Sequence, residues 1–147
     1  MARELRTQID VAAPAALGWQ VLTAFADYPE WNPFIIEAPG GRAVENATFR
    51  YRFEFPRGVR ARAQARILRA EPEAELRWQA SAISPAIFNG EHYFLLRPTS
   101  PSEFVFHHGE LFSGALLPLA LPVLQRAGPP IYRELNVRFK ERVERLL

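Results

Sequence analysis

The sequence predicts an α+β fold, in which an antiparallel sheet carries its helices on one side. Residues 46–69 alternate between apolar and polar side chains around a turn, which is the period expected for two paired strands. Residues 89–112 repeat this alternation around the turn sequence PTSP. Residues 131–147 carry apolar side chains at helical spacing, and an amphipathic helix of this length needs a sheet face to cover.

Composition limits the class of protein. The 147 residues are enough for one domain with a sizeable core, so we expect a single domain spanning residues 1–147. The chain has no cysteine, no apolar run of about 18 residues and no secretory pattern in its first ten residues. We therefore expect a cytoplasmic protein without membrane insertion, disulfides or thiolate-bound metal.

The basic side chains are almost all arginine. Lys140 is the only lysine among 18 basic residues, and the formal net charge is +2. This usage is typical of a GC-rich bacterial genome, although arginine can also be selected for contacts with phosphate or nucleic acid. The small net charge argues against a nucleic-acid partner.

The N-terminal region predicts a strand followed by a helix. Residues 5–13 alternate loosely, and Pro14 suits the first turn of a helix over residues 15–25. Gly18 costs this helix about 1 kcal/mol relative to alanine, so either a neighbour packs closely there or the residue is suboptimal. The apolar side of the helix is formed by Leu17, Val21, Leu22 and Phe25.

The segment FADYPEWNPF, residues 25–34, combines four aromatic rings with two prolines. Pro29 and Pro33 lack a backbone donor and disfavour helical geometry in the residue before them. We expect a short bent helix or turn here, followed by a strand in FIIEAPGG, residues 34–41. The rings form either an ordinary corner of the core or one wall of a site for an apolar guest.

The first hairpin has aromatic residues opposite alanines. If its turn closes at Arg57, three pairs are expected, which are Phe53 with Ala61, Tyr51 with Ala63 and Phe49 with Ala65. Such pairs either interdigitate tightly or leave unfilled volume beside the rings. The opposite face must be solvated or meet an anion, because it brings together Arg50, Arg52, Arg62 and Arg66.

Residues 75–82 and the second hairpin complete the sheet. Leu76, Trp78 and Ala80 share one face. If the second hairpin closes near residue 100, Leu96 lies opposite Phe104, Phe94 opposite Phe106 and His92 opposite His108, with Glu110 and Phe112 continuing the same face. This face is aromatic near the turn and polar at its other end.

A long C-terminal helix is expected to cover the inner face of the sheet. Residues 115–130 predict a helix with a kinked start, which Pro129 and Pro130 restart. Its apolar stripe is formed by Ile131, Leu135, Phe139, Val143 and Leu146, and its other face by Arg133, Glu141 and Arg145.

The candidates for chemistry are His92, His108 and Glu110. A buried glutamate beside two imidazoles can act as a general acid and base, ligate a metal ion, or form a polar network that orients a ligand. We expect the network and no metal, because nothing in the sequence brings the three side chains to one point. GxSxG and GxGxxG motifs and phosphate loops are absent from the sequence, so no cofactor is expected.

Four segments together resemble a known family: AP…W.VLT.FADYPEWNPF, LRW, GEH.F.L and HGE.FSG.L.P. Over residues 3–146 the chain is similar to the SRPBCC (START-like) superfamily, and most to its small bacterial proteins grouped with polyketide cyclases and dehydrases. The resemblance implies a helix-grip fold, in which a curved antiparallel sheet of about seven strands wraps around the C-terminal helix. It also implies an apolar cavity for lipids, sterols, polyketides or similar molecules.

The resemblance places Trp31 and Phe34 at one end of this cavity. With the inward positions of the strands and the helix, the candidate cavity residues are Trp31, Phe34, Phe49, Tyr51, Phe53, Trp78, His92, Phe94, Phe106, His108, Glu110, Leu135 and Phe139. The chain departs from the family pattern at Gly18, at Ala24 and in residues 45–48, so the ligand's identity does not transfer.

Three classes of function remain. The preferred one is binding or carriage of a small hydrophobic molecule, lipid-like or polyketide-like, by a monomer or homodimer. The second is a cyclase or dehydratase that uses histidine and glutamate for proton transfer. The third is a protein-interaction module whose sheet or arginine face meets a protein or an anionic surface, as some relatives do when they bind chaperones.

Overall fold

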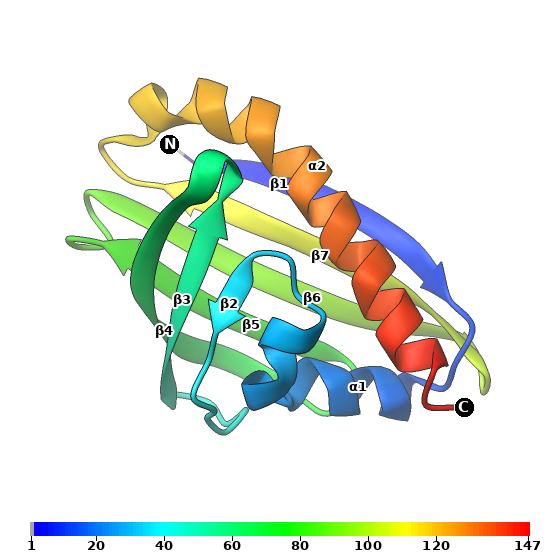
Figure 1. The fold of residues 1–147 in the computed structure, drawn as a ribbon. Coiled ribbons are helices and arrows are strands. Elements are labelled where there is room, and N and C mark those ends of the chain that lie inside the picture. The colour runs from blue at the N-terminus through cyan, green and yellow to red at the C-terminus, as the bar shows by residue number, and fades with distance from the viewer. Residues whose placement is uncertain (1) are drawn as a thin grey trace.

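The computed structural model describes residues 2–147, and in it a seven-stranded antiparallel sheet curls around a long helix (Figure 1). The strands are β1 (Ala2–Val11), β2 (Ile35–Glu37), β3 (Thr48–Phe55), β4 (Val59–Glu71), β5 (Glu75–Ala82), β6 (Phe88–Ser100) and β7 (Glu103–Ser113). The helices are α1 (Ala15–Thr23), the short 3-10 helices η1 (Phe25–Glu30) and η2 (Pro56–Gly58), and α2 (Leu117–Glu144). The expected α+β class and helix-grip arrangement are confirmed.

The sheet has the order β1-β7-β6-β5-β4-β3-β2, so that the first strand pairs with the last. Figure 1 shows α2 crossing one face of this sheet, with α1 and the β2 region on the same side. No helix in the described part of the chain has both the length and the apolar character needed to cross a membrane.

The first hairpin has the expected register. Phe53 pairs with Ala61, Tyr51 with Ala63 and Phe49 with Ala65, across a turn in which Arg57 has φ 71°. Beside Ala65 the space is filled, because Ala65 is buried and its partner Phe49 stacks on Phe25 with ring centroids 4.4 Å apart. Nearer the turn, Ala63 is half-buried and lines an open surface pocket and Ala61 is exposed, so tight interdigitation describes only the Phe49–Ala65 end of the hairpin.

The register predicted for the second hairpin is wrong by two residues. His92 pairs with Glu110, Phe94 with His108, and Leu96 with Phe106. The turn is centred on Pro101 and Ser102 instead of residue 100, and the register also shifts between Pro98 and Ser100. Because a shift of two residues preserves the side of the sheet, the inner face keeps its predicted members.

Helix α2 runs unbroken from Leu117 to Glu144, so the expected restart at Pro129 and Pro130 is wrong. The helix instead changes direction along its length (Figure 1), as expected where prolines remove backbone donors. Leu146 lies beyond its end and is exposed. The residues buried along the helix are Leu117, Tyr132, Leu135, Asn136, Phe139 and Val143.

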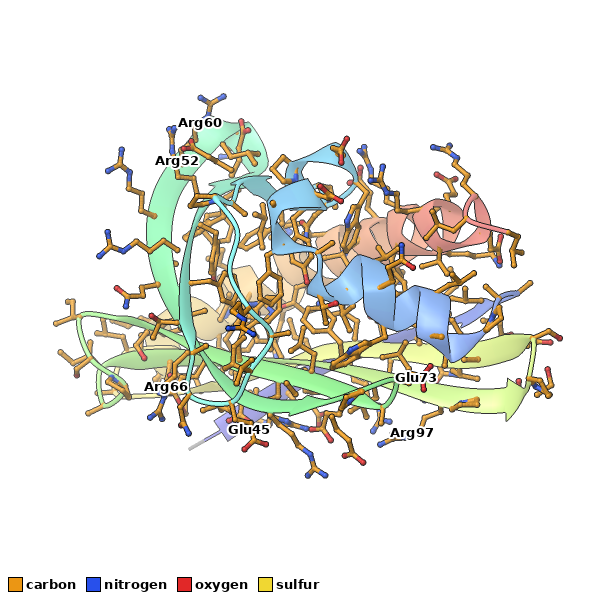
Figure 2. The ribbon with its side chains drawn as sticks, turned by 90° about the horizontal axis from the view of Figure 1, so that it is seen from below. Glu45, Arg52, Arg60, Arg66, Glu73 and Arg97 are labelled. Atoms are coloured by element: carbon orange, nitrogen blue, oxygen red, sulfur yellow. The ribbon has the colours of Figure 1, made fainter. Side chains whose placement is uncertain are left out.

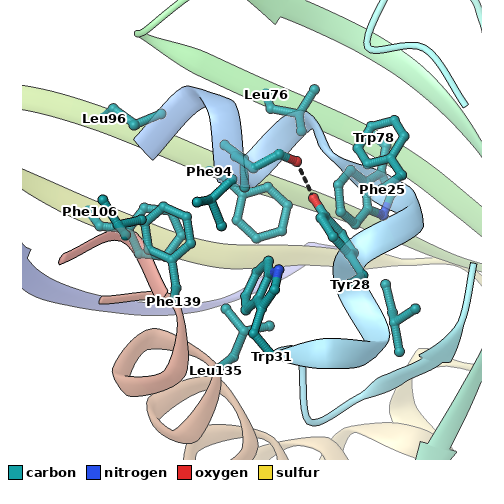
Figure 3. Close-up of a cluster of buried hydrophobic side chains, with 14 of the residues drawn as sticks. Phe25, Tyr28, Trp31, Leu76, Trp78, Phe94, Leu96, Phe106, Leu135 and Phe139 are labelled. Carbon is teal, nitrogen blue, oxygen red and sulfur yellow. Dashed lines mark hydrogen bonds between the residues drawn. The ribbon is translucent and has the colours of Figure 1, made fainter. Parts of the chain in front are cut away.

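The segment FADYPEWNPF forms η1 and the turn into β2. Phe25, Tyr28 and Trp31 are buried in the aromatic core (Figure 3), where the Tyr28 hydroxyl donates to the carbonyl of Leu22. The side chain of Asn32 fixes the turn, since its Oδ1 accepts from the backbone N–H groups of residues 34 and 35 at 2.8 and 2.9 Å. Pro29 lies within η1 and Pro33 follows its end, while the rings of Phe25, Tyr28 and Trp31 remain out of water.

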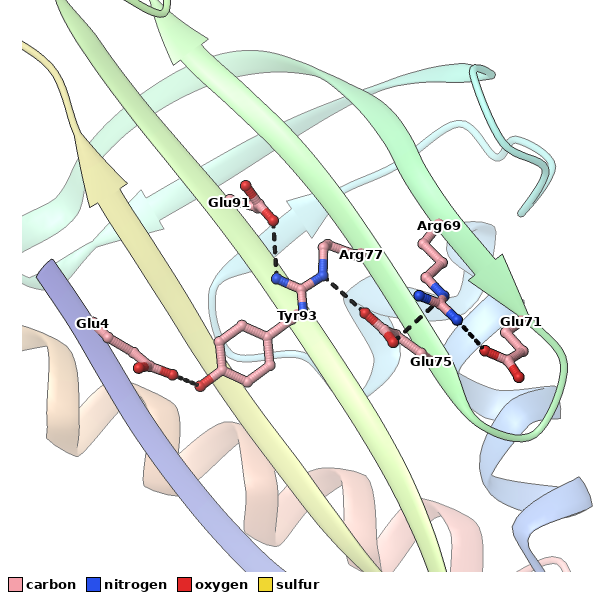
Figure 4. A network of polar contacts seen from close by, with 7 residues as sticks. All are labelled: Glu4, Arg69, Glu71, Glu75, Arg77, Glu91 and Tyr93. Carbon is pink, nitrogen blue, oxygen red and sulfur yellow. Dashed lines mark hydrogen bonds and ion pairs between the residues drawn. The ribbon is translucent and has the colours of Figure 1, made fainter. Parts of the chain in front are cut away.

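The outer face of the sheet carries a network of paired charges (Figure 4). Arg77 contacts Glu75 and Glu91, each at 2.9 Å, and lies 5.0 Å from the Tyr93 ring centroid. Arg69 contacts Glu71 at 2.7 Å and Glu75 at 3.5 Å. The arginines of β4 and β5 in this network are therefore neutralised by carboxylates on the same face.

Replacing Gly18 with alanine is expected to destabilise the protein by about 2 kcal/mol, although alanine is the better helix former. An alanine Cβ would lie 2.6 Å from Phe104 Cζ and 2.7 Å from Leu96 Cδ2, in a densely packed core. Close packing therefore explains this glycine. Urea unfolding measures the effect, and Gln20→Ala, an exposed change in α1, should stay within about 0.5 kcal/mol of the parent. A more stable Gly18→Ala protein would contradict this account.

Candidate ligand-binding site

An apolar pocket lies between the inner face of the sheet and α2. Its cavity of about 20 Å³ has room for one water molecule. Strands β2, β3, β5, β6 and β7 contribute to its walls together with α2 and the turn before β2. The lining residues are Asn32, Phe34, Ile35, Tyr51, Trp78, His92, Phe94, His108, Ile131, Tyr132 and Leu135.

A buried carboxylate connects the sheet to α2 beside this pocket. Glu110 on β7 accepts from His92 Nε2 on β6 at 2.9 Å and from the Tyr132 hydroxyl on α2. Gly90 provides the space for it, because a Cβ at that position would lie 2.2 Å from Glu110 Oε2. Burial, and then the charge of Glu110, raises the pKa of Tyr132, so the tyrosine remains a neutral donor.

A second polar group holds β1, β7 and α2 together. His108 Nδ1 lies 3.2 Å from Asn136 Oδ1, and Asn136 Nδ2 donates to Thr7 Oγ1 at 2.8 Å. The Thr7 hydroxyl in turn donates to the carbonyl of His108 at 2.9 Å. Burial, followed by the neighbouring His92, lowers the pKa of His108 to about 3, so its imidazole is neutral at physiological pH.

Two buried nitrogen atoms of the pocket walls have no hydrogen-bond partner within the described residues. They are Trp78 Nε1 and His92 Nδ1, on adjacent strands where the two residues pair directly and their ring centroids are 5.6 Å apart. The Tyr51 hydroxyl lies near the indole N–H without reaching hydrogen-bond geometry, and burial followed by Glu110 raises its pKa. Buried polar atoms are rarely left unpaired, so each of these nitrogens would stabilise a bound polar atom that reached it.

The structure brings together only part of the predicted set. Phe34, Tyr51, Trp78, His92, Phe94, His108 and Leu135 line the pocket. Glu110 does not line the cavity itself but contacts His92 and Tyr132, which do. Phe53 lies nearer the surface, where its ring stacks on that of Phe34 with centroids 5.0 Å apart. The remaining predicted residues, Trp31, Phe49, Phe106 and Phe139, pack in the core away from the cavity.

The sequence did not predict four of the residues that line the pocket, which are Asn32, Ile35, Ile131 and Tyr132. Of these, Ile131 was predicted only as part of the apolar stripe of the helix. Asn136, which holds His108, was also missed. Tyr132 and Asn136 are four residues apart, and they lie three residues before Leu135 and Phe139 respectively, so helical spacing places all of them on one face. A search for polar residues within the apolar stripe would have found both.

An open groove lies next to the pocket, between the β3–β4 turn and the first half of α2. It has a volume of about 740 Å³ and is lined by Phe55, Arg57, Val59, Ala120, Pro122, Val123, Leu124, Arg126 and Ala127. Phe34 separates it from the pocket, because its ring lines the pocket and lies 5.3 Å from the ring of Phe55. Along α2, Ala127 faces the groove and Ile131, one turn later, faces the pocket.

The described residues contain no group of three His, Cys, Asp or Glu side chains placed to hold a metal ion. Although His92, Glu110 and His108 lie near each other, His92 and His108 have ring centroids 6.4 Å apart and His108 is bonded to Asn136. The cluster is a hydrogen-bonded network at the polar end of an apolar pocket.

The fold and this site define a helix-grip protein with an apolar pocket that ends in polar side chains. The chain belongs to the family described as polyketide cyclase / dehydrase and lipid transport, whose model matches residues 2–144. The predicted superfamily is thereby confirmed. No curated protein matches the sequence.

Solved structures share the fold at low sequence identity. The Zhui aromatase/cyclase from Streptomyces sp. R1128 has a TM-score of 0.79 at 15% identity, covering 99% of this chain and 95% of that one. A START superfamily protein from Mycobacterium smegmatis has a TM-score of 0.77 at 18% identity, covering 98% and 99%. Norcoclaurine synthase from Thalictrum flavum, solved with dopamine and hydroxybenzaldehyde, has a TM-score of 0.69 at 15% identity, covering 99% and 88%.

Proposed function

We propose that this protein binds and carries a small hydrophobic molecule that bears a hydroxyl group. The observation that carries the proposal is the pair of unpartnered nitrogens, Trp78 Nε1 and His92 Nδ1, in an otherwise apolar pocket. The family description, which includes lipid transport, and the fold shared with an aromatase/cyclase support the same class of ligand.

From the hydrogen-bonding roles of the two nitrogens we infer that the ligand carries a hydroxyl group. The indole N–H of Trp78 can only donate. Since the carboxylate of Glu110 only accepts, His92 Nε2 carries the proton toward it, and in the neutral ring Nδ1 is an acceptor. A hydroxyl accepts from one nitrogen and donates to the other, whereas a ketone or ether can satisfy only the tryptophan.

The ligand needs more room than the 20 Å³ of the closed pocket. The adjacent groove supplies it if Phe34 moves, because this ring lines the pocket and contacts Phe55, which lines the groove. Phe34 is only half-buried and follows the turn at Asn32, so its movement leaves the core aromatics in place. The bound molecule would lie with its hydroxyl at Trp78 and its apolar body toward the groove.

The test compares 2-naphthol with naphthalene as probes, using fluorescence or calorimetric titration. We expect 2-naphthol to bind about 30-fold more tightly, since it gains two neutral hydrogen bonds and each contributes about 1 kcal/mol. Trp78→Phe leaves only the hydrogen bond to His92 Nδ1, so it should lower this preference to about fivefold. Trp31→Phe is a matched control, because Trp31 Nε1 is also buried and unpartnered but does not line the pocket. Equal binding of both probes, or an equal effect of the two substitutions, would refute the proposal.

Proton-transfer catalysis is a second candidate, supported by the His92–Glu110–Tyr132 connection. In such an enzyme Glu110 would orient His92 through their hydrogen bond, with the free Nδ1 of His92 available to the ligand. Native mass spectrometry of freshly purified protein would identify a bound molecule, which is then tested for turnover. A cyclase or dehydratase should lose at least about a hundredfold in rate on Glu110→Gln, and a carrier should return its ligand unchanged.

A further inference from the structure

The groove beside the pocket opens onto an apolar surface, here called the mouth face. It is formed by Phe55 and Val59 at the β3–β4 turn, Leu119 and Val123 on α2, and Arg57 and Arg126. Its aliphatic side chains are strongly exposed, with 79% of Leu119, 66% of Val123 and 57% of Val59 accessible to solvent. Leu119 and Val123 are four residues apart on α2 and therefore project from the same side of the helix.

Positive charge is concentrated in the two segments that contribute to this face, although Arg66 lies toward the end of β4 away from the turn. Residues 49–66 contain six arginines and one glutamate, and residues 115–130 contain Arg126 as their single charged residue. Since the whole chain has a net charge of +2, the remainder is net acidic. Figure 2 shows Arg52 and Arg60 at the β3–β4 end of the molecule, with Arg97 far from them.

These arginines differ from those of the outer network. Arg69 and Arg77 each contact two carboxylates, whereas Arg57 and Arg126 make no ion pair among the described residues. The same holds for Arg50, Arg62 and Arg66 on the hairpin's outer side, where Arg52 pairs with Glu37 and Arg60 approaches Glu54 at 3.7 Å. The mouth face therefore has uncompensated positive charge beside exposed aliphatic side chains.

We propose that the mouth face docks on an anionic lipid surface. Aliphatic side chains at the centre would enter the acyl boundary, while the arginines contact lipid phosphates, as in other interfacial binding surfaces. A symmetric dimer through this face would bring the arginines of one copy close to the arginines of the other, which like-charge repulsion disfavours. Docking at the interface needs no membrane-spanning helix. The inference rests on the proposed function in one respect, which is the reason for docking: a protein that carries a hydrophobic ligand would collect it from lipid.

The test is co-sedimentation with vesicles of phosphatidylcholine alone and of phosphatidylcholine with about 30% phosphatidylglycerol. Each arginine near an anionic surface contributes about fivefold in partitioning, so Arg57→Gln/Arg126→Gln should lower binding to anionic vesicles about 30-fold. Leu119→Gln/Val123→Thr should lower it at least about tenfold through the loss of apolar insertion. Raising the salt concentration should weaken binding of the parent protein.

Matched controls remove the same groups elsewhere. Arg97→Gln/Arg145→Gln lowers the net charge equally but lies off the mouth face, and Val137→Thr changes an exposed valine on the solvent side of α2. Both should leave vesicle binding within about twofold of the parent. The proposal is overturned by absence of binding to anionic vesicles, by equal losses in the controls, or by light scattering that shows a dimer dissociated by the mouth-face variants.

Binding of 2-naphthol in vesicle-free buffer is measured on the same samples. If naphthol binds and vesicles do not, the docking inference alone fails. If vesicles bind in the expected pattern and naphthol does not, the proposed function alone fails.

Discussion

Replacing Phe139 with alanine is expected to destabilise the protein by about 4 kcal/mol. The ring is fully buried, stacks on Phe106 with centroids 4.0 Å apart and lies 5.6 Å from Trp31. It joins α2 to Phe106 on β7 and to Trp31 after η1, and Figure 3 shows the three side chains near one another. Since small domains have about 5–15 kcal/mol of total stability, the substitution removes a large share of it.

Urea unfolding followed by circular dichroism measures the effect. Val137→Ala is the matched control, because this valine lies on the same helix, is 45% exposed and should cost less than about 0.5 kcal/mol. A loss below about 1.5 kcal/mol for Phe139→Ala would contradict the account, since it would mean that α2 does not depend on this contact.

The two hairpins differ in how well their pairing could be predicted from the sequence. The first turn contains Pro56 and Gly58, which confine the turn to one place, and its register was predicted residue by residue. The sequence near the second turn contains two prolines, Pro98 and Pro101. Pro98 lies within β6, where it pairs with Phe104 just before the register shift. Sequence alone could not distinguish which proline marks the turn, but period two still placed His92 and Glu110 on one face.

The candidate site was harder to predict, because its polar contacts join distant segments. Alternation on β6 and β7 identifies His92 and Glu110, but Tyr132 and Asn136 lie on a helix whose rotation was inferred from apolar residues only. A polar residue on the buried side of a helix does not fit an apolar stripe, so the pattern assigned neither residue a role. The outcome reflects a general property of binding sites, which place hydrogen-bonding groups where local patterns favour apolar ones.

The stability of the protein is expected to fall as the pH is lowered from 7.5 to 5, by about 2 kcal/mol on account of His108 alone. In the folded protein the pKa of His108 is lowered to about 3 by burial and by nearby His92, while in the unfolded chain it has its ordinary value of 6.5. Below pH 6.5 the unfolded chain therefore takes up a proton that the folded protein does not. The stabilisation is fully present above pH 6.5 and is lost progressively toward pH 3.

Urea unfolding at half-unit steps between pH 7.5 and 5 checks this expectation, in a range above the titration of most carboxylates. His108→Asn removes the titrating ring but retains an N–H donor for Asn136, so its stability should fall by about 2 kcal/mol less than the parent's over this range. His107→Asn is the control, because His107 occupies the outer face, where partial burial, Arg6 and Arg97 also lower its pKa. Its removal should leave most of the loss in place. An identical pH dependence of His108→Asn and the parent would show that the buried imidazole is not the group that opposes protonation.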